Sequence, residues 1–337
     1  MGNYYSITQI EEIGNELTNN NENNDNNYIK YGCKKDKYDH RDLRLVFNRK
    51  KLLANKKSHD LRDVCPPIYN QGKLGSCTAN AICGLYEFDE LFQSENENNE
   101  LKFRPSRLFL YYNERDMEGN TGTDAGAEIR DGMKSINRIG VCSETEWPYD
   151  ISTFTEKPSN ECYESAKDHH TIKYRRLNHN INQFKACISS GFPFVFGFQV
   201  FESFETQEVA ETGDMVMPQD DEKVLGGHAI MAVGYDDDKQ VFIIQNSWGE
   251  EWGDKGYFYM PYEFIKNQEW CSDFWTCSKV SENNVELRNS ETQCNIKREC
   301  ITSEAQTSEE IRKSIESSIN TSSSTCQTDT CLKEKND

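Results

Sequence analysis

The stretch Gln71-Gly72-Lys73-Leu74-Gly75-Ser76-Cys77-Thr78-Ala79-Asn80-Ala81 joins a short Gly/Ser turn directly to a run with helical periodicity. Apolar residues follow at three- and four-residue spacing, at Ile82, Leu85, Phe88, Leu91 and Phe92, which predicts a helix over 77–93. Cys77 then lies at the helix N-terminus, where unpaired backbone N–H groups and the helix dipole favour thiolate over thiol. Because a thiolate attacks carbonyl carbons, Cys77 is a candidate nucleophile, with a buried structural cysteine as the alternative.

Three further residues fit a site built around this cysteine. Gln71 precedes it across the glycine turn, where a side-chain amide can turn back and donate to an oxyanion. The nucleophile also needs a base, and of the six histidines only His228 begins an apolar, strand-like run, directly after two glycines. Asn246 follows the next strand-like run, so its amide oxygen can accept the Nδ1–H of His228 and orient the ring.

The composition excludes several classes of partner. The 337 residues carry a net charge of −19 and a mean hydropathy of −0.85, which argues against nucleic acid or an anionic membrane as the main partner. No apolar run is long enough to span a bilayer, and residues 1–18 lack the apolar core of a secretory signal. We therefore expect a reducing, cytoplasmic location with mostly free cysteines. The cysteine spacings do not favour zinc, and we expect no metal or cofactor.

Four regions are expected along the chain. Residues 1–30 form an Asn-rich, disordered N-terminus, and 281–337 form a Ser/Thr/Glu-rich, largely disordered tail. The folded body spans 58–280. Its first half has helical patterns at 77–93, 106–114 and 127–139, and its second half has strand patterns at 194–200, 227–235 and 241–245. This order predicts an α+β fold of two sub-domains with the active site in the cleft between them.

Residues 31–57 form a basic arm ahead of an acidic body. The arm is either a solvated linker or a segment that docks as a propeptide-like lid, and the lid hypothesis expects deletion of 1–57 to raise activity. The N-terminal Met1-Gly2-Asn3-Tyr4-Tyr5-Ser6 fits the N-myristoylation pattern at Gly2, although one acyl chain anchors a protein only weakly.

Three blocks together resemble the signature of papain-family cysteine proteases: Gln71…Gly75-Ser76-Cys77, Gly227-His228-Ala229-Ile230, and Asn246-Ser247-Trp248-Gly249 continuing to Trp252-Gly253. The resemblance covers about 59–265. It implies a papain-like fold, with a helical part and an antiparallel β-barrel-like part, and a thiol endopeptidase that cleaves peptides and proteins through a cysteine acyl-enzyme.

The resemblance also implies a role for each matched residue. Cys77 is the nucleophile, His228 the general base and acid, and Asn246 the residue that orients His228. Gln71 and the Cys77 backbone N–H hold the oxyanion. Trp248 shields the His–Asn hydrogen bond, Gly126 pairs with substrate backbone, and Trp252 forms a wall on the leaving-group side or is a structural aromatic.

Departures from the family pattern leave some questions open. Leu74 and Thr123 stand where the family has the two cysteines of one disulfide, and Thr78 replaces the aromatic residue after the nucleophile. The long pro-region is missing, so zymogen control rests on the 31–57 arm. A peptide ligase using the same acyl-enzyme and a non-catalytic peptide-binding scaffold remain alternatives. The Asn-rich character suggests the enzyme of a large DNA virus, which would make it virion-associated. The specificity of the S2 pocket, the biological substrate and the oligomeric state are not predicted.

Overall fold

The computed structural model describes residues 31–47, 51–52, 56–93 and 103–282, all within the compact unit Met1–Asn284. The expected disorder of 1–30, the myristoylation pattern at Gly2 and the tail beyond Glu282 lie outside the described residues. Ser281 and Glu282, which were expected in that tail, belong to the last strand. In the described part of the chain no helix is long and apolar enough to cross a membrane.

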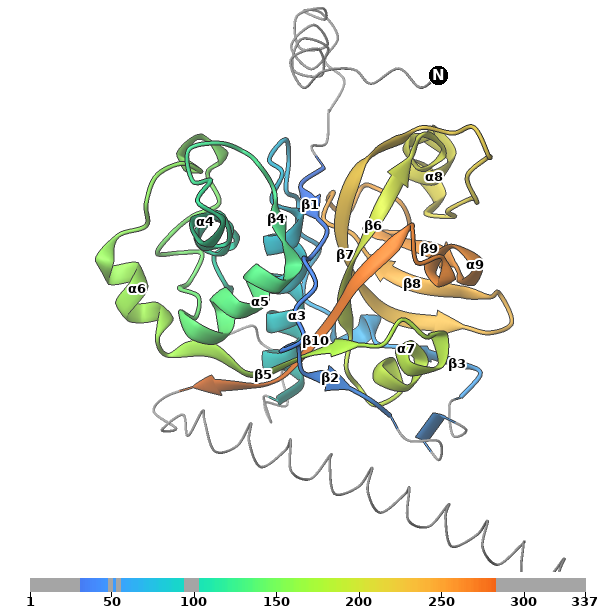
Figure 1. The fold of residues 1–337 in the computed structure, drawn as a ribbon, viewed down its shortest axis with the longest axis horizontal. Coiled ribbons are helices and arrows are strands. Elements are labelled where there is room, and N and C mark those ends of the chain that lie inside the picture. Colours follow the sequence, from blue (N-terminus) through green and yellow to red (C-terminus); the bar gives the residue numbers. More distant parts are fainter. Residues whose placement is uncertain (1–30, 48–50, 53–55, 94–102, 283–337) are drawn as a thin grey trace, which may run out of the picture. The chain divides into compact units, whose positions relative to one another are not determined.

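Helices dominate the first half of the body, on the left of Figure 1. The predicted helix over 77–93 is confirmed to the residue, and the other two differ only at their ends. Ser106 caps the second by accepting the Phe109 N–H, and Gly119 ends it in the left-handed conformation. The helices are α3 (Cys77–Gln93), α4 (Arg107–Glu118), α5 (Ile129–Arg138) and α6 (Asn160–Ala166).

Strands of the second half, joined by two short strands from the segment before α3, form an eight-stranded sheet, most of which lies on the right of Figure 1. Seven strands lie in the order β2 (Arg44–Leu45), β5 (His169–Leu177), β10 (Cys271–Glu282), β6 (Phe194–Phe201), β7 (Val224–Asp236), β8 (Val241–Gln245) and β9 (Tyr257–Pro261). The eighth, β3 (Ser58–Asp60), pairs with β7. All the pairs are antiparallel except β2–β5. The short helices α7 (Ile181–Ile188), α8 (Gln207–Thr212) and α9 (Tyr262–Lys266) connect these strands.

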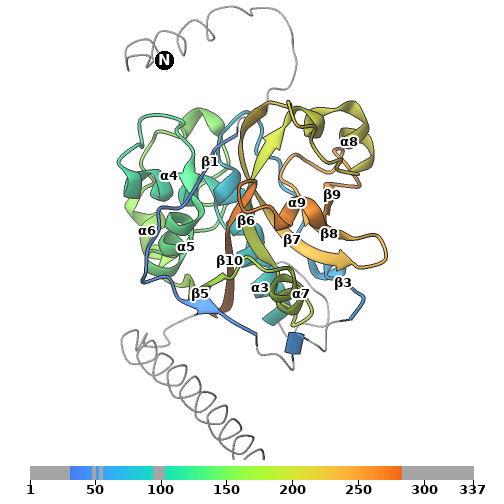
Figure 2. The same ribbon diagram turned by 45° about the vertical axis from the view of Figure 1, so that its right-hand side comes forward.

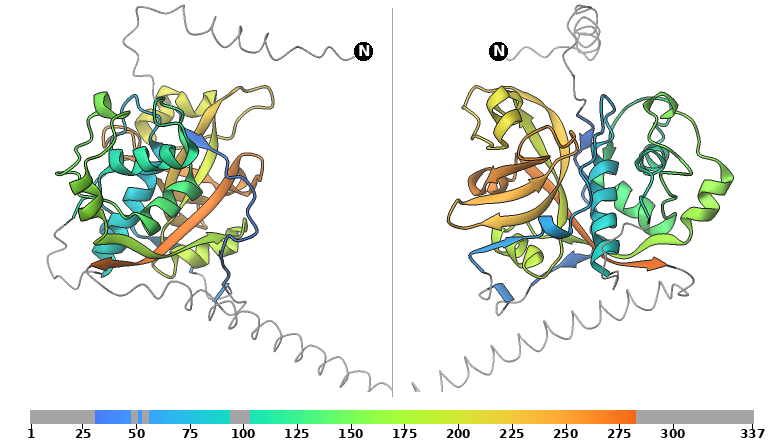
Figure 3. Two further views of the ribbon diagram at one scale, coloured as in Figure 1. Left: turned by 60° about the vertical axis from the view of Figure 1, so that its left-hand side comes forward. Right: turned by 180° about the vertical axis from the view of Figure 1, so that it is seen from behind.

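Helix α3 lies between the two halves, as the view from behind in Figure 3 shows. It contacts α4 and α5 on one side and β7 and β10 on the other. Its first residues, Cys77, Thr78 and Ala79, are therefore fully buried. The expected α+β fold with two sub-domains is confirmed, and the nucleophile candidate lies where they meet.

The start of the basic arm is folded onto the body, so residues 31–47 are not a solvated linker. β1 (Cys33–Lys34) pairs in parallel with β4 (Ala127–Glu128); β1 lies between the two halves in Figure 1 and in front of the helical half in the turned view of Figure 2. Further along, the Phe47 N–H donates to Gln183 Oε1 at 2.8 Å and the Phe47 carbonyl accepts from Gln183 Nε2 at 3.2 Å.

A buried polar cluster anchors the middle of this arm. The Asp36 carboxylate is fully buried and accepts three hydrogen bonds, from the Arg130 backbone N–H (3.0 Å), Trp275 Nε1 (2.8 Å) and Arg176 (3.1 Å). The Asp36 N–H donates to Asp273, and burial together with the nearby Asp273 carboxylate raises the pKa of Asp36. Asp42, also in the arm, pairs with Arg130 at 2.8 Å and Arg176 at 3.3 Å. We call Asp36, Asp42, Asp273, Arg130 and Arg176 the anchor cluster.

The anchor cluster predicts a large stability cost for one substitution in the arm. Asp36→Ala removes a buried acceptor and leaves the donors that face it without a hydrogen-bond partner. We therefore expect the free energy of unfolding to fall by about 2–4 kcal/mol. The exposed Lys37, next along the arm, is the matched control, and Lys37→Ala should change it by about 0.5 kcal/mol or less. Urea denaturation monitored by tryptophan fluorescence measures both. Equal, small effects would mean that the arm is not docked.

Candidate active site

Cys77 begins helix α3 and its side chain is fully inaccessible to solvent. Hydrogen bonds from the backbone of Ala229, Gly32 and Thr78 lower the pKa of the thiol, but burial outweighs them and raises it to about 11. The bond from Ala229 places the sulfur against β7, next to His228. The helix N-terminus expected to favour the thiolate is therefore present, but in this covered form the thiol is neutral at pH 7.

His228 is held by Asn246 through one specific ring nitrogen. His228 Nε2 lies 2.8 Å from Asn246 Oδ1, and the same oxygen accepts the Ser247 backbone N–H at 2.9 Å. Because a backbone N–H can only donate, the amide oxygen faces this position, and His228 Nε2 must carry a hydrogen. The sequence-based expectation of an Nδ1–H bond was wrong. Nδ1 is buried without a hydrogen bond to the described residues, and burial lowers the pKa of His228 to about 4.

Aromatic side chains enclose this histidine. Trp248 stacks on the imidazole with ring centroids 4.9 Å apart and planes 29° apart. Trp252 packs edge-on behind Trp248 at 4.9 Å and also contacts Phe204 and Phe258. Trp248 is therefore placed to exclude water from the His–Asn pair. Trp252 supports Trp248, and both a wall on the leaving-group side and a purely structural aromatic stay open as its role.

Gln71 is fully buried in the loop before α3. Its Oε1 accepts the Ser247 hydroxyl at 2.7 Å, and its Nε2 donates to the Leu74 carbonyl at 3.0 Å. The Gln71 N–H also donates to the Ser247 carbonyl at 2.8 Å. Ser247 therefore joins the Asn246 segment to the Gln71 loop and points the amide N–H end of Gln71 toward the turn that carries Cys77.

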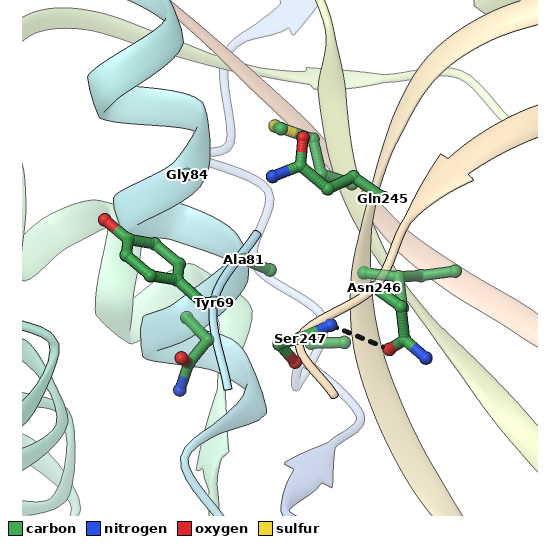
Figure 4. Close-up of a pocket in the computed structure, with 10 residues that line it drawn as sticks. Tyr69, Ala81, Gly84, Gln245, Asn246 and Ser247 are labelled. Atoms are coloured by element: carbon green, nitrogen blue, oxygen red, sulfur yellow. Dashed lines mark hydrogen bonds between the residues drawn. The ribbon is translucent and has the colours of Figure 1, made fainter. Parts of the chain in front are cut away.

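A small cavity lies behind the His–Asn pair, between α3 and strands β7 and β8 (Figure 4). Its volume of about 10 Å³ holds roughly one water molecule. Its lining includes Tyr69, Gly84, Gln245, Asn246 and Ser247, and Figure 4 shows the Ser247–Asn246 hydrogen bond at its edge. This cavity is too small for a peptide, so substrate must enter from the other side of Cys77.

That other side is filled by residues 31–34 of the arm, which we call the plug. The Tyr31 ring packs against His228 and Trp248, with ring centroids 6.2 Å and 6.3 Å apart, respectively. The Gly32 backbone contacts the Cys77 sulfur, and a β-carbon on Gly32 would lie 1.8 Å from the Gly75 carbonyl oxygen. The Cys33 carbonyl oxygen would lie 2.3 Å from a β-carbon on Gly227, and the Cys33 sulfur would lie 2.9 Å from one on Gly197.

Gly126 lies directly opposite the plug. Its φ of +68° favours glycine, and a β-carbon there would lie 2.1 Å from the Gly32 carbonyl oxygen. The next residue, Ala127, donates its N–H to that oxygen at 2.8 Å. The N–H that binds the plug backbone is therefore that of Ala127, and the pairing of Gly126 itself with substrate stays a prediction.

The sequence patterns located the catalytic candidates but missed the plug and the contribution of Ser247. Only the positive charge of the arm pointed to docking, whereas the plug itself contacts the site through the Gly32 backbone and the Tyr31 ring. In the described ranges no cluster of His, Cys, Asp or Glu is arranged to hold a metal ion.

Comparison with known proteins identifies the family. Residues 55–274 match the papain family cysteine protease model. An uncharacterized peptidase C1-like protein of Acanthamoeba polyphaga mimivirus is 43% identical over 276 residues, covering 75% of this chain and 88% of the relative. Cysteine proteinase 1 of Entamoeba histolytica is 27% identical and covers 58% and 60%.

Solved structures agree with this assignment. Xylellain, a cysteine protease from Xylella fastidiosa, matches with a TM-score of 0.68 and 39% identity, over 74% of this chain and 96% of the other. ProCathepsin B S9 from Trypanosoma congolense shares the fold, with a TM-score of 0.60 and 17% identity, over 83% of this chain and 99% of the other. The chain belongs to the papain family of cysteine peptidases.

Proposed function

We propose that the protein is a thiol endopeptidase that hydrolyses peptide bonds through an acyl-enzyme on Cys77. The observation that carries this proposal is the fixed tautomer of His228, whose Nε2–H is taken by Asn246 Oδ1. This leaves the Nδ1 lone pair to accept the Cys77 proton as the sulfur attacks the scissile carbonyl. The imidazolium then gives that proton to the leaving amine, and water releases the acyl group.

The oxyanion of each tetrahedral intermediate needs donors on the face of the carbon opposite His228. We infer that the Cys77 backbone N–H and Gln71 Nε2 supply them, because Ser247 orients the Gln71 amide toward this turn. The same acyl-enzyme would serve a peptide ligase if an amine replaced water, so product analysis with added peptide amine separates the two activities.

We further propose that the plug is an intramolecular inhibitor and not a substrate. The leaving amine must lie near His228, so a substrate runs from the Gly126 side, at its N-terminal part, toward Trp248. The plug runs the opposite way, with Tyr31 at His228 and Trp248 and with Cys33–Lys34 beside Ala127–Glu128. It therefore presents the Gly32 amide to the sulfur, while the Gly32 carbonyl turns to Ala127.

The anchor cluster limits what can be removed from the arm. Asp36 and Asp42 neutralise Arg130 and Arg176, which belong to the body, and β2 is part of the main sheet. Deletion of 1–57 would leave the buried Arg130 and the half-buried Arg176 with fewer partners, so lower activity in that truncation would not argue against inhibition. A point change in the plug is the better test.

The catalytic assignment predicts a specific loss. Cys77→Ala should reduce hydrolysis of a fluorogenic peptide by at least about 10³-fold, because no other group can form the acyl-enzyme. Cys83→Ala, which alters another buried cysteine of α3, is the matched control and should keep activity within about threefold of the wild type if its folded fraction is unchanged. Comparable rates for Cys77→Ala and the wild type, in protein shown to be folded by circular dichroism, would refute the assignment.

The plug predicts an activating substitution in the full-length chain. In Gly32→Ala the new methyl group would collide with the Gly75 backbone, which disfavours the docked plug by about 1–3 kcal/mol and should raise peptidase activity by roughly 10–100-fold. Gly122→Ala is the control, since a β-carbon there meets nothing within 4 Å. Unchanged or lower activity of folded Gly32→Ala would exclude an inhibitory plug.

The buried thiol predicts a pH dependence. A cysteine pKa raised to about 11 means that the thiolate fraction, and so alkylation of Cys77 by iodoacetamide, rises about tenfold per pH unit from pH 7 to 10. Gly32→Ala exposes the thiol to water, so the alkylation rate of Cys77 in this variant should stop rising, and reach its plateau, at a lower pH than in the wild type. Mass spectrometry of the Cys77 peptide measures both profiles. A wild-type plateau below pH 8 would contradict a covered, neutral thiol.

A further inference from the structure

The two loops that form the substrate-binding face of the site are joined by one carboxylate. Asp124, in the loop that leads to Gly126, accepts the Gly75 backbone N–H with both oxygens at 3.1 Å. A β-carbon on Gly75 would lie 2.9 Å from Asp124 Oδ1, so only glycine permits this approach. Gly75 is two residues before the nucleophile, and the contact therefore ties the Cys77 turn to the Gly126 segment.

Tyr111 of α4 extends this connection to Gly126 itself. Its hydroxyl donates to Asp124 Oδ1 and accepts the Gly126 backbone N–H at 3.1 Å. A continuous path of hydrogen bonds thus runs from Gly126 through Tyr111 and Asp124 to Gly75. The Tyr111 ring is fully buried, so the hydroxyl has little freedom to leave this position.

Arg115, one turn further along α4, holds the same loop. The residue is fully buried, and its guanidinium donates to the carbonyls of Thr121 (2.9 Å), Thr123 (3.0 Å) and Phe154. It also lies over the Tyr111 ring, 4.2 Å from the centroid. The loop backbone on both sides of Gly122 is thereby fixed before the chain reaches Asp124.

We propose that Asp124 and Tyr111 are positioning residues of the peptidase, which set the distance between the segment that binds substrate backbone and the turn that carries the nucleophile. The proposal rests on the proposed function. Neither residue touches reacting atoms, and both act through Gly75 and Gly126. We call the hydrogen bonds from Gly126 through Tyr111 and Asp124 to Gly75 the link. The link lies beside Leu74 and Thr123, so a polar connection joins the two loops where this chain has no cysteine pair.

The geometry explains why such a link matters. Peptide bound along Ala127 reaches the sulfur of Cys77 only if the two loops keep their spacing, and a displacement of about 1 Å can cost roughly 100-fold in rate. A small acyl ester that does not extend to Gly126 needs no such alignment. The two kinds of substrate should therefore respond differently when the link is broken.

The test compares Asp124→Ala and Tyr111→Phe in the full-length wild type and in full-length Gly32→Ala. We expect Asp124→Ala to lower kcat/KM by about 10–100-fold for a peptide with three residues before the scissile bond. Hydrolysis of p-nitrophenyl acetate at Cys77 should change by less than about threefold. The double variant of Asp124→Ala and Tyr111→Phe should show a smaller fold-loss of kcat/KM than the product of the two single fold-losses, because both residues belong to one path of hydrogen bonds. Asp116→Ala, an exposed carboxylate of the same helix α4, should leave both substrates unaffected.

Two outcomes would overturn the proposal. Equal losses for peptide and ester, after correction for the folded fraction, would show that Asp124 only stabilises the fold. No loss for the peptide would show that the loops keep their spacing without it. If the parent chains hydrolyse neither substrate, the proposed peptidase function fails instead, so the two failures are distinguishable.

Discussion

The packing of helix α3 against strand β7 is the interaction on which the rest of the site depends. It places the N-terminal residue of a buried helix against the backbone of Ala229, so the thiol of Cys77 and the ring of His228 come from different halves of the protein and meet at their boundary. Buried hydrogen bonds then hold this arrangement: Asn246 binds the His228 ring, and Ser247 joins the Asn246 segment to Gln71 in the loop before Cys77. The catalytic geometry is thus a consequence of how the helical part docks on the sheet.

The burial that builds the site also changes the charge of its two reacting groups. With the plug in place, desolvation raises the pKa of Cys77 and lowers that of His228, so thiol and imidazole are both neutral near pH 7. The arm has two parts with different attachments. The plug contacts the site through its backbone and through the Tyr31 ring, which meets His228 edge-on, whereas Asp36 and Asp42 are held by Arg130 and Arg176. Release of the plug therefore does not require the anchor cluster to separate.

Sequence reasoning located the elements that depend on local pattern. The apolar spacing after Cys77 predicted α3 to the residue, and the strand-like runs placed His228 on one strand and Asn246 directly after the next. It could not locate contacts between residues far apart in the chain, such as Asp36 with Trp275 or Asp124 with Gly75, because no local periodicity encodes them. It also misassigned the ring nitrogen of His228, because which nitrogen faces Asn246 depends on the side-chain orientation that the folded site imposes on His228.

The central claim is that Cys77 carries the acyl group during turnover once the plug has left. The most direct measurement is intact-protein and peptide mass spectrometry of full-length Gly32→Ala, acid-quenched while it hydrolyses an activated peptide ester. We predict a transient mass increase equal to the acyl group, located on Cys77 and scarce in the wild-type chain. Turnover with no acyl group on Cys77, or equal acylation of the wild type, would contradict it.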